Sequence, residues 1–381
     1  MKDFNFDIPV DRYHTASLKW ERYGDKDIIP LWVADMDFRS PSAVIQALDR
    51  RVEHGIFGYG VAPVGLTEAV CNYLLVKYEW KVDPQWLVWL PGLVCGLNVA
   101  CRSVGAEHDH VMTLTPIYPP FLTAPGSSKR ELITVPLSPG KDKWEIDFDL
   151  LEQSITEKTG LLLLCNPHNP AGRVFSRQEL DKLISICDRH DIIICSDEIH
   201  CDLILDTDKK HIPAASISRE AADRTITLMA PSKTFNIPGL GCSFAIISNA
   251  PLRNKFLKAM AGIVPEVNVL GFSAAEAAYR DGWDWLEALL DYLRLNSRLV
   301  EQEINSMDGL VMKHVEATYL AWIDARTIDK ISPGRFFEKF GVGLFEGSDF
   351  GCPGFVRLNF GCPRTLLLEA LNRMRKAIDK K

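Results

Sequence analysis

The sequence lacks CxxC cysteine pairs, long apolar runs and blocks of basic residues, and these absences narrow its function. Several of its ten cysteines, for example Cys165, Cys195 and Cys242, lie inside apolar runs, as buried reduced thiols do. No stretch approaches the ~18 uninterrupted apolar residues that suggest a membrane span. The net charge is −7 and lysines and arginines form no block, so we expect neither nucleic acid nor a membrane as a partner.

The beginning of the chain also lacks the apolar segment of a secretory signal. Together with the reduced thiols, this predicts a cytoplasmic location. What the chain does contain is ordinary for a globular protein, with 47% hydrophobic and 24% charged residues. Its 381 residues suffice for two domains, or for one large domain with a smaller satellite.

Short apolar runs alternate with helical segments through the middle of the chain. The runs expected to form strands span residues 86–90, 110–115, 130–135, 160–165, 191–195, 225–229 and 242–247. Runs of five or six apolar residues between helices are typical of a mostly parallel sheet covered on both faces. We therefore predict an α/β fold with a sheet of about seven strands.

The pattern divides the chain into three parts. Residues 1–45 are irregular but rich in aromatic side chains, which predicts an arm that also belongs to part of a smaller domain. Residues 46–280 hold the predicted strands and form the large domain. Residues 281–381 begin with a long amphipathic helix and continue with short strands and helices, as in a small α+β domain.

The most informative residue is Lys233, which follows the apolar run 225–229 after a break at Pro231. Open α/β sheets bind ligands at the ends of such strands. There, partial desolvation favours the neutral amine, the form that condenses with a carbonyl. The alternative is a surface lysine that opens a turn.

Polar residues also follow two neighbouring strands, at 166–169 and 197–200, and parallel strands would bring them to the same edge as Lys233. A strand, Gly92 and a helix start follow one another at 86–94, which predicts an anion site with free backbone N–H groups. This loop is neither a Walker loop nor a GxGxxG fingerprint, so it does not indicate a nucleotide.

One cofactor suits these groups especially well, namely pyridoxal phosphate. Its aldehyde would bond Lys233, and its phosphate would lie at residues 92–94 with help from Ser232. Its ring nitrogen needs an anionic partner, for which Asp197 is the candidate. The alternatives for Asp197 are a helix cap and a surface acid.

Four motifs support this interpretation, and with them the chain resembles the fold-type I pyridoxal-phosphate enzymes, the class I/II aminotransferase superfamily, over its whole length. The motifs are Asn166-Pro167-His168-Asn169-Pro170-Ala171-Gly172, Ser196-Asp197-Glu198-Ile199-His200, Ala230-Pro231-Ser232-Lys233-Thr234-Phe235-Asn236 and Phe355-Val356-Arg357-Leu358-Asn359. Residues 31–38 and 115–121 are most similar to the cystathionine β-lyase or C–S lyase branch.

The resemblance implies a role for each cofactor contact. Lys233 would be the Schiff-base lysine and the proton carrier at Cα, and Asp197 would pair with the pyridinium nitrogen. Asn169 would bond the ring hydroxyl, and the Asn169–Pro170 peptide is expected to be cis. Tyr118 would stack on the ring, although a core aromatic is a close alternative.

The remaining implied contacts concern the phosphate, the substrate and a second subunit. The phosphate would be held by Gly92, Leu93, Val94 and Ser232. Tyr59 would reach the phosphate of the neighbouring subunit, which implies a homodimer with shared sites. Arg357 would clamp the α-carboxylate of an amino-acid substrate, a task suited to a guanidinium.

Two positions depart from the common aminotransferase pattern. His200 stands where many members carry a tyrosine, and Gly241 where many carry a phosphate-binding arginine. His200 would tune the ring hydroxyl differently, or pack as a structural residue under the cofactor. A metal site at residues 200–202 is not expected, because adjacent residues of a strand point to opposite faces.

The predicted activity is α,β-elimination by a carbon–sulfur lyase. An L-cysteine S-conjugate such as L-cystathionine would yield a thiol, pyruvate and ammonia. The alternatives are an aminotransferase of the same fold and a regulatory protein that keeps the cofactor pocket.

Overall fold

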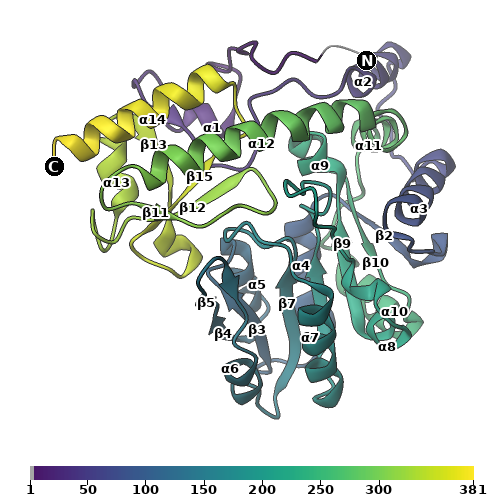
Figure 1. Cartoon of the computed structure of the whole chain (residues 1–381). Coiled ribbons are helices and arrows are strands. Elements are labelled where there is room, and N and C mark those ends of the chain that lie inside the picture. The colour runs from purple at the N-terminus through teal and green to yellow at the C-terminus, as the bar shows by residue number, and fades with distance from the viewer. Residues whose placement is uncertain (1–3) are drawn as a thin grey trace.

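The computed structural model describes residues 4–381, and its largest element is a seven-stranded sheet (Figure 1). The strands lie in the order β2-β10-β9-β8-β7-β3-β4. Their bounds are β2 (Leu87–Leu90), β3 (His110–Thr115), β4 (Glu131–Pro136), β7 (Thr159–Cys165), β8 (Ile193–Asp197), β9 (Thr225–Met229) and β10 (Ser243–Ile246). Strand β10 is antiparallel to both of its neighbours, β2 and β9, and the other pairs of this sheet are parallel. The predicted mostly parallel α/β sheet is confirmed.

The sheet is buried on both faces, as the apolar runs predict. In β7, Leu161 and Leu163 belong to one hydrophobic cluster, whereas Leu162 and Leu164 belong to another. The first cluster includes residues of α4 (Leu93–Ser103), α5 (Pro119–Ser127) and α10 (Ala250–Met260). The second includes residues of α6 (Phe148–Gln153), α7 (Arg177–Arg189) and α8 (Arg219–Arg224).

Another group of helices packs together near the edge of the sheet formed by β2 and β10, where Trp89 of β2 contacts Phe272. It contains α2 (Ser42–His54), α3 (Val64–Tyr78) and α11 (Val269–Asp281). The sequence analysis did not predict α10 or α11. Gly282 joins α11 to the long helix α12 (Trp283–Asn305), where a Cβ atom would lie 2.6 Å from the Phe235 ring. Glycine is therefore required for α11 to approach the segment that carries Lys233.

The C-terminal part contains a second, antiparallel sheet. Its strands lie in the order β11-β12-β15-β14, and their bounds are β11 (Val311–Met312), β12 (Leu320–Asp324), β14 (Phe345–Glu346) and β15 (Phe355–Asn359). Helices α13 (Pro333–Glu338) and α14 (Arg364–Asp379) accompany it, and α12 and α14 run beside each other (Figure 1).

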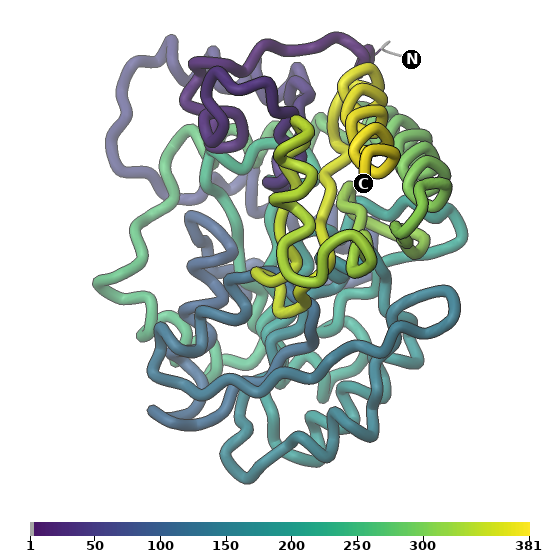
Figure 2. Tube along the Cα trace, turned by 90° about the vertical axis from the view of Figure 1, so that its left-hand side faces the viewer, coloured from purple at the N-terminus to yellow at the C-terminus, as the bar shows by residue number. Residues whose placement is uncertain are grey.

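The N-terminal segment joins this second sheet region rather than the large sheet. Strand β1 (Ile29–Pro30) pairs in parallel with β13 (Val342–Gly343). Figure 2 shows the purple N-terminal trace, which includes the short helix α1 (Leu18–Glu21), beside the yellow-green C-terminal trace. A small hairpin of β5 (Ser138–Pro139) and β6 (Trp144–Glu145) completes the strands. The division into domains at residues 45 and 280 stays a prediction.

Candidate active site

Lys233 lies in the short helix α9 (Pro231–Thr234), directly after the buried strand β9. Pro231 starts this helix, because a proline at the first helical position forfeits no hydrogen bond. The side chain is partly buried, and its Nζ donates a hydrogen bond to the Ala34 carbonyl. Burial lowers the pKa of Lys233 to about 8, against the opposing effect of Asp35. The amine is thus much closer to its neutral, nucleophilic form than a surface lysine.

Asp197 ends the neighbouring strand β8 and is only 5% exposed. Its Oδ1 accepts a hydrogen bond of 3.1 Å from the Ile199 N–H, but no cation among the described residues pairs with it. Burial raises the pKa of Asp197 to about 7, and the neighbouring Glu198 raises it further. A cationic ring nitrogen would offset the cost of burying the charged carboxylate.

Glu198, next to Asp197, has a structural task instead. It is fully buried and accepts hydrogen bonds from Ser196 Oγ at 2.8 Å and the Ala214 N–H at 3.0 Å. Its other oxygen lies 2.7 Å from His211 Nε2. These contacts occupy both oxygens of Glu198, so Asp197 is the acid left for a ligand.

Arg357, in β15, is 1% exposed and has no acidic partner among the described residues. Its Nη1 donates to Asn169 Oδ1 and its Nη2 to the Trp32 carbonyl, both at 2.9 Å, and its Nε has no partner. Burial lowers the pKa of Arg357 to about 10. The guanidinium also lies over the Phe345 and Phe350 rings, so the groups that contact it are all uncharged. A carboxylate would supply the charge partner that a buried guanidinium lacks here, and the predicted substrate contact of Arg357 stays a prediction.

Asn169 is 5% exposed, and its Oδ1 accepts the hydrogen bond from Arg357 Nη1, so the two predicted site residues are in direct contact. The Asn169–Pro170 peptide is cis, as predicted. Tyr118 is partly buried and begins helix α5. Burial raises its pKa, and both Arg357 and Asp197 influence it.

The predicted phosphate site lies at the start of α4. Gly92 precedes its first turn, and a Cβ atom placed there would meet nothing within 4 Å. Leu93 is buried and Val94 is exposed, and the N–H groups of this first turn have no helical partners. Ser232 is partly buried beside Lys233. Open space in front of a helix start suits a phosphate.

The two departures from the common pattern have different structural settings. His200 is 2% exposed, its Nδ1 has no partner, and burial lowers its pKa to about 3, so it is neutral. Gly241 has a φ of +58°, and a Cβ atom there would lie 3.0 Å from the Pro91 carbonyl oxygen. A side chain at position 241 would therefore be strained with this backbone.

Tyr59, which is predicted to contact a phosphate, projects into solvent. Its side chain is fully exposed in a segment that connects α2 to α3. A side chain this exposed makes little contact with its own chain, and its predicted contact with the phosphate of a second subunit stays a prediction.

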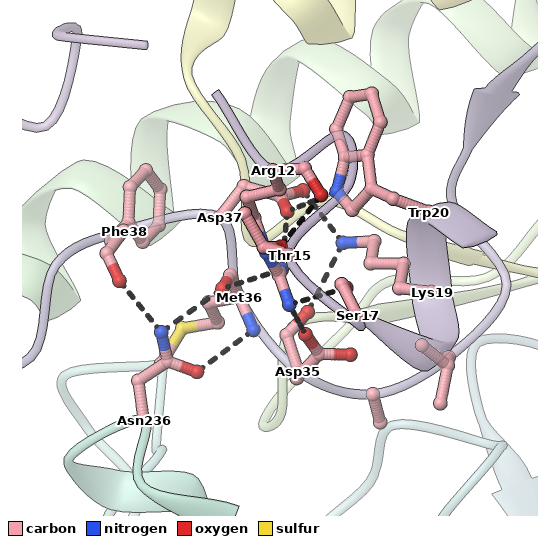
Figure 3. Close-up of polar contacts among 12 residues, drawn as sticks. Arg12, Thr15, Ser17, Lys19, Trp20, Asp35, Met36, Asp37, Phe38 and Asn236 are labelled. Atoms are coloured by element: carbon pink, nitrogen blue, oxygen red, sulfur yellow. Dashed lines mark hydrogen bonds and ion pairs between the residues drawn. The ribbon is translucent and has the colours of Figure 1, made fainter. Parts of the chain in front are cut away.

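The sequence analysis missed residues that bond the segment next to Lys233 and thereby fix its position. Thr234 Oγ1 donates to Asp202 Oδ2 at 3.0 Å, and both Tyr73 and Tyr78 donate to Asp202 Oδ1 at 2.8 Å. Asn236 bonds the backbone of residues 36–38 (Figure 3). The position of Asn236 within the lysine motif was a possible signal, whereas nothing in the sequence connects Asp202 to Tyr73.

The described residues fit pyridoxal phosphate. A lysine with a lowered pKa, a buried acid without a cation and an open helix start are present at one edge of the sheet. Each complements a different part of the cofactor, namely the aldehyde, the ring nitrogen and the phosphate.

Comparison with known proteins agrees with this geometry. The sequence profile described as aminotransferase class I and II matches residues 26–374. The chain belongs to this family. The superfamily predicted from the four motifs is thereby confirmed.

Within the family, several relatives match the chain over nearly its whole length. Cystathionine β-lyase PatB of Bacillus subtilis is 37% identical, over 98% of this chain and 100% of its own. The crystal structure of OvoB is 49% identical with a TM-score of 0.97, over 99% and 100%. The pyridoxal-phosphate-bound C–S lyase of Staphylococcus hominis is 33% identical with a TM-score of 0.92, over 99% and 98%. PatB and the Staphylococcus protein represent the predicted branch.

Proposed function

We propose that this protein is a pyridoxal-phosphate-dependent carbon–sulfur β-lyase that cleaves L-cystathionine or related L-cysteine S-conjugates. With one water, the conjugate yields a thiol, pyruvate and ammonia. The observation that carries this proposal is the buried Arg357, which has only neutral partners beside the enclosed amine of Lys233. The lyase relatives, similar over their full length, support it.

When bound, pyridoxal phosphate supplies an electron sink for the carbanion at the substrate Cα. Arg357 binds the α-carboxylate and thereby orients the Cα–H bond. Lys233 removes that proton, a role for which its pKa of about 8 is well matched. Asp197 would stabilise the positive charge on the ring nitrogen of the cofactor, which the electron sink requires. The electron pair from Cα then forms the double bond to Cβ as the Cβ–S bond breaks, and the thiolate leaves.

A cavity beside Lys233 offers room for the leaving thiol. Its volume is about 800 Å³, and its lining includes Lys233, Asp35, Arg12 and Asn236. Cavities of roughly 300–1,000 Å³ accommodate small organic ligands. The lining is mostly apolar, with the charged side chains of Arg12 and Asp35 and the Asn236 amide among it, which suits a substrate such as cystathionine that has a polar group beyond a carbon–sulfur chain.

The test is to incubate the cofactor-loaded protein with L-cystathionine and to measure pyruvate and free thiol. We expect equal amounts of both products, and no product with Lys233→Ala. Amino transfer to a keto acid without pyruvate would instead identify an aminotransferase. A protein that binds the cofactor but acts on no amino acid would indicate the regulatory alternative.

We further propose a homodimer in which Tyr59 contacts the phosphate in the partner's site. The segment around Tyr59 supports this, because Ile56, Phe57, Val61 and Val64 are all more than half exposed.

We also propose a cytoplasmic location. All ten cysteines are free thiols, which suits a reducing compartment. No described helix is long and apolar enough to cross a membrane.

A further inference from the structure

Residues 31–38, which we call the strap, contact both functional cations of the site. The Ala34 carbonyl accepts hydrogen bonds from Lys233 Nζ and, at 2.9 Å, from the Tyr319 hydroxyl. The Trp32 carbonyl accepts one of 2.9 Å from Arg357 Nη2. The position of the strap backbone therefore determines where the amine and the guanidinium lie.

A cluster of charged side chains fixes the strap from the N-terminal side, and we call Arg12, Lys19, Asp35 and Asp37 the latch (Figure 3). Arg12 bonds Asp35 Oδ2 and Asp37 Oδ1, each at 2.6 Å. Lys19 bonds Asp37 Oδ2 at 2.7 Å and the Asp35 carbonyl at 3.1 Å. The two cations and two carboxylates balance in charge.

Arg12 and Lys19 contribute differently to the latch. Lys19 is 1% exposed and, together with the Trp20 indole at 2.9 Å, still pairs Asp37 when Arg12 is removed. Arg12 is 22% exposed and comes from the outer part of the arm. Among the described residues, it alone bonds both carboxylates of the strap. Its loss would therefore loosen the strap without leaving a fully buried charge unpaired.

Asn236 transmits the position of the strap back to the lysine. Its Oδ1 accepts from the Met36 N–H at 2.9 Å, and its Nδ2 donates to the Met36 carbonyl at 3.0 Å and the Phe38 carbonyl at 2.8 Å. Figure 3 shows these contacts of Asn236 with the strap. Because Asn236 lies three residues after Lys233, which itself bonds the Ala34 carbonyl, the strap and the lysine segment are joined at two points.

We propose that Arg12 is a positioning residue of the active site. By tying Asp35 to Asp37, it holds the Ala34 and Trp32 carbonyls against Lys233 and Arg357. Arg12 therefore affects the reaction indirectly, by positioning Lys233 and Arg357. The kinetic part of this inference rests on the proposed lyase function, whereas its effect on Lys233 does not.

The test compares Arg12→Met, Arg12→Lys and a control, Arg39→Met, in the cofactor-loaded protein. Arg39 lines the same cavity but is exposed and has no salt bridge with a described residue. One readout is the pH midpoint of the absorption band of the bound cofactor, which reports the environment of Lys233. The others are kcat and KM with L-cystathionine, cofactor affinity and Tm.

For Arg12→Met we expect kcat/KM per bound cofactor to fall ~10–100-fold, because small displacements of reacting groups are costly. We expect the absorption midpoint to shift by about half a pH unit or more, since the polar contacts of the Lys233 amine change. Arg12→Lys should restore only part of the activity, because an ammonium cannot present the guanidinium fork. Arg39→Met should leave the absorption midpoint unchanged, because Arg39 forms no salt bridge with the strap.

The inference is overturned if Arg12→Met lowers only Tm or cofactor occupancy and leaves both the midpoint and kcat/KM per bound cofactor unchanged. It is also overturned if Arg39→Met shifts the absorption midpoint as far as Arg12→Met does. If the wild-type protein cleaves no cysteine conjugate, the proposed function fails. The absorption midpoint still decides the role of Arg12 in that case.

Discussion

The pKa of Asp197 has a consequence for stability in the cofactor-free protein. Its pKa is about 7 in the folded chain, against an ordinary value of 3.8, and burial is the main cause. The folded state therefore binds the proton more tightly than the unfolded state. The resulting stabilisation is present below pH ~4 and is lost as the pH rises through 7.

We predict that Asp197→Asn is more stable than the wild type at pH 8 when both lack the cofactor. Asparagine keeps an oxygen for the Ile199 N–H and has no charge to bury. At about 1.4 kcal/mol per pKa unit, the gain is on the order of 1–4 kcal/mol. Urea unfolding at pH 4 and pH 8 measures it, and the difference between the proteins should grow with pH.

The same substitution should weaken cofactor binding, because the ring nitrogen loses its anionic partner. A titration followed by cofactor absorbance measures this second effect. Opposite signs for stability and affinity are the expected result. An Asn variant that is less stable at pH 8, or that binds the cofactor as tightly as the wild type, would contradict the proposed role of Asp197.

At the scale of elements, Asp202 connects the segment after β8 to the lysine helix α9. Its carboxylate accepts three hydroxyl hydrogen bonds, from Thr234, Tyr73 and Tyr78, and it is 4% exposed. This contact fixes the separation between the segment that carries Asp197 and the helix that carries Lys233. Asp202 is thus a connection between elements rather than a ligand of the substrate.

We predict that Asp202→Asn lowers the free energy of unfolding by ~1–3 kcal/mol, because one acceptor becomes a donor that faces hydroxyl groups. Tyr78→Phe, the matched control, removes one of the donors and should cost only ~0.5–1.5 kcal/mol. Chemical denaturation of the cofactor-free proteins gives both values. Equal losses for the two variants would show that Asp202 is not the centre of this network.

The elements that the sequence predicted are those with local signals. Strand β9, the break at Pro231 and the motif around Asp197 depend on neighbouring residues, and their positions were predicted within a few residues. The Arg12–Asp35 and Asp202–Tyr73 contacts join residues far apart in the chain, and such pairs leave no periodic pattern. The roles assigned to the individual site residues stay predictions.

For the whole molecule, the exposed apolar segment at 56–64 supports the proposed homodimer. Tyr59 is 105% exposed in one chain, and apolar side chains surround it in the sequence. A surface of this kind marks a protein interface. In a two-fold dimer, the same segment of each subunit would approach the site of the other. Each active site would then combine residues of both chains.

We predict that two inactive variants complement each other when their subunits mix. Lys233→Ala disables the site of its own chain, whereas Tyr59→Ala disables the site of its partner. A mixed dimer then carries both lesions in one site and leaves the other intact. After unfolding and refolding an equal mixture, random pairing should restore about a quarter of wild-type pyruvate production per subunit. Each variant refolded alone serves as the control, and a mixture without recovered activity would show that Tyr59 does not serve the partner's site.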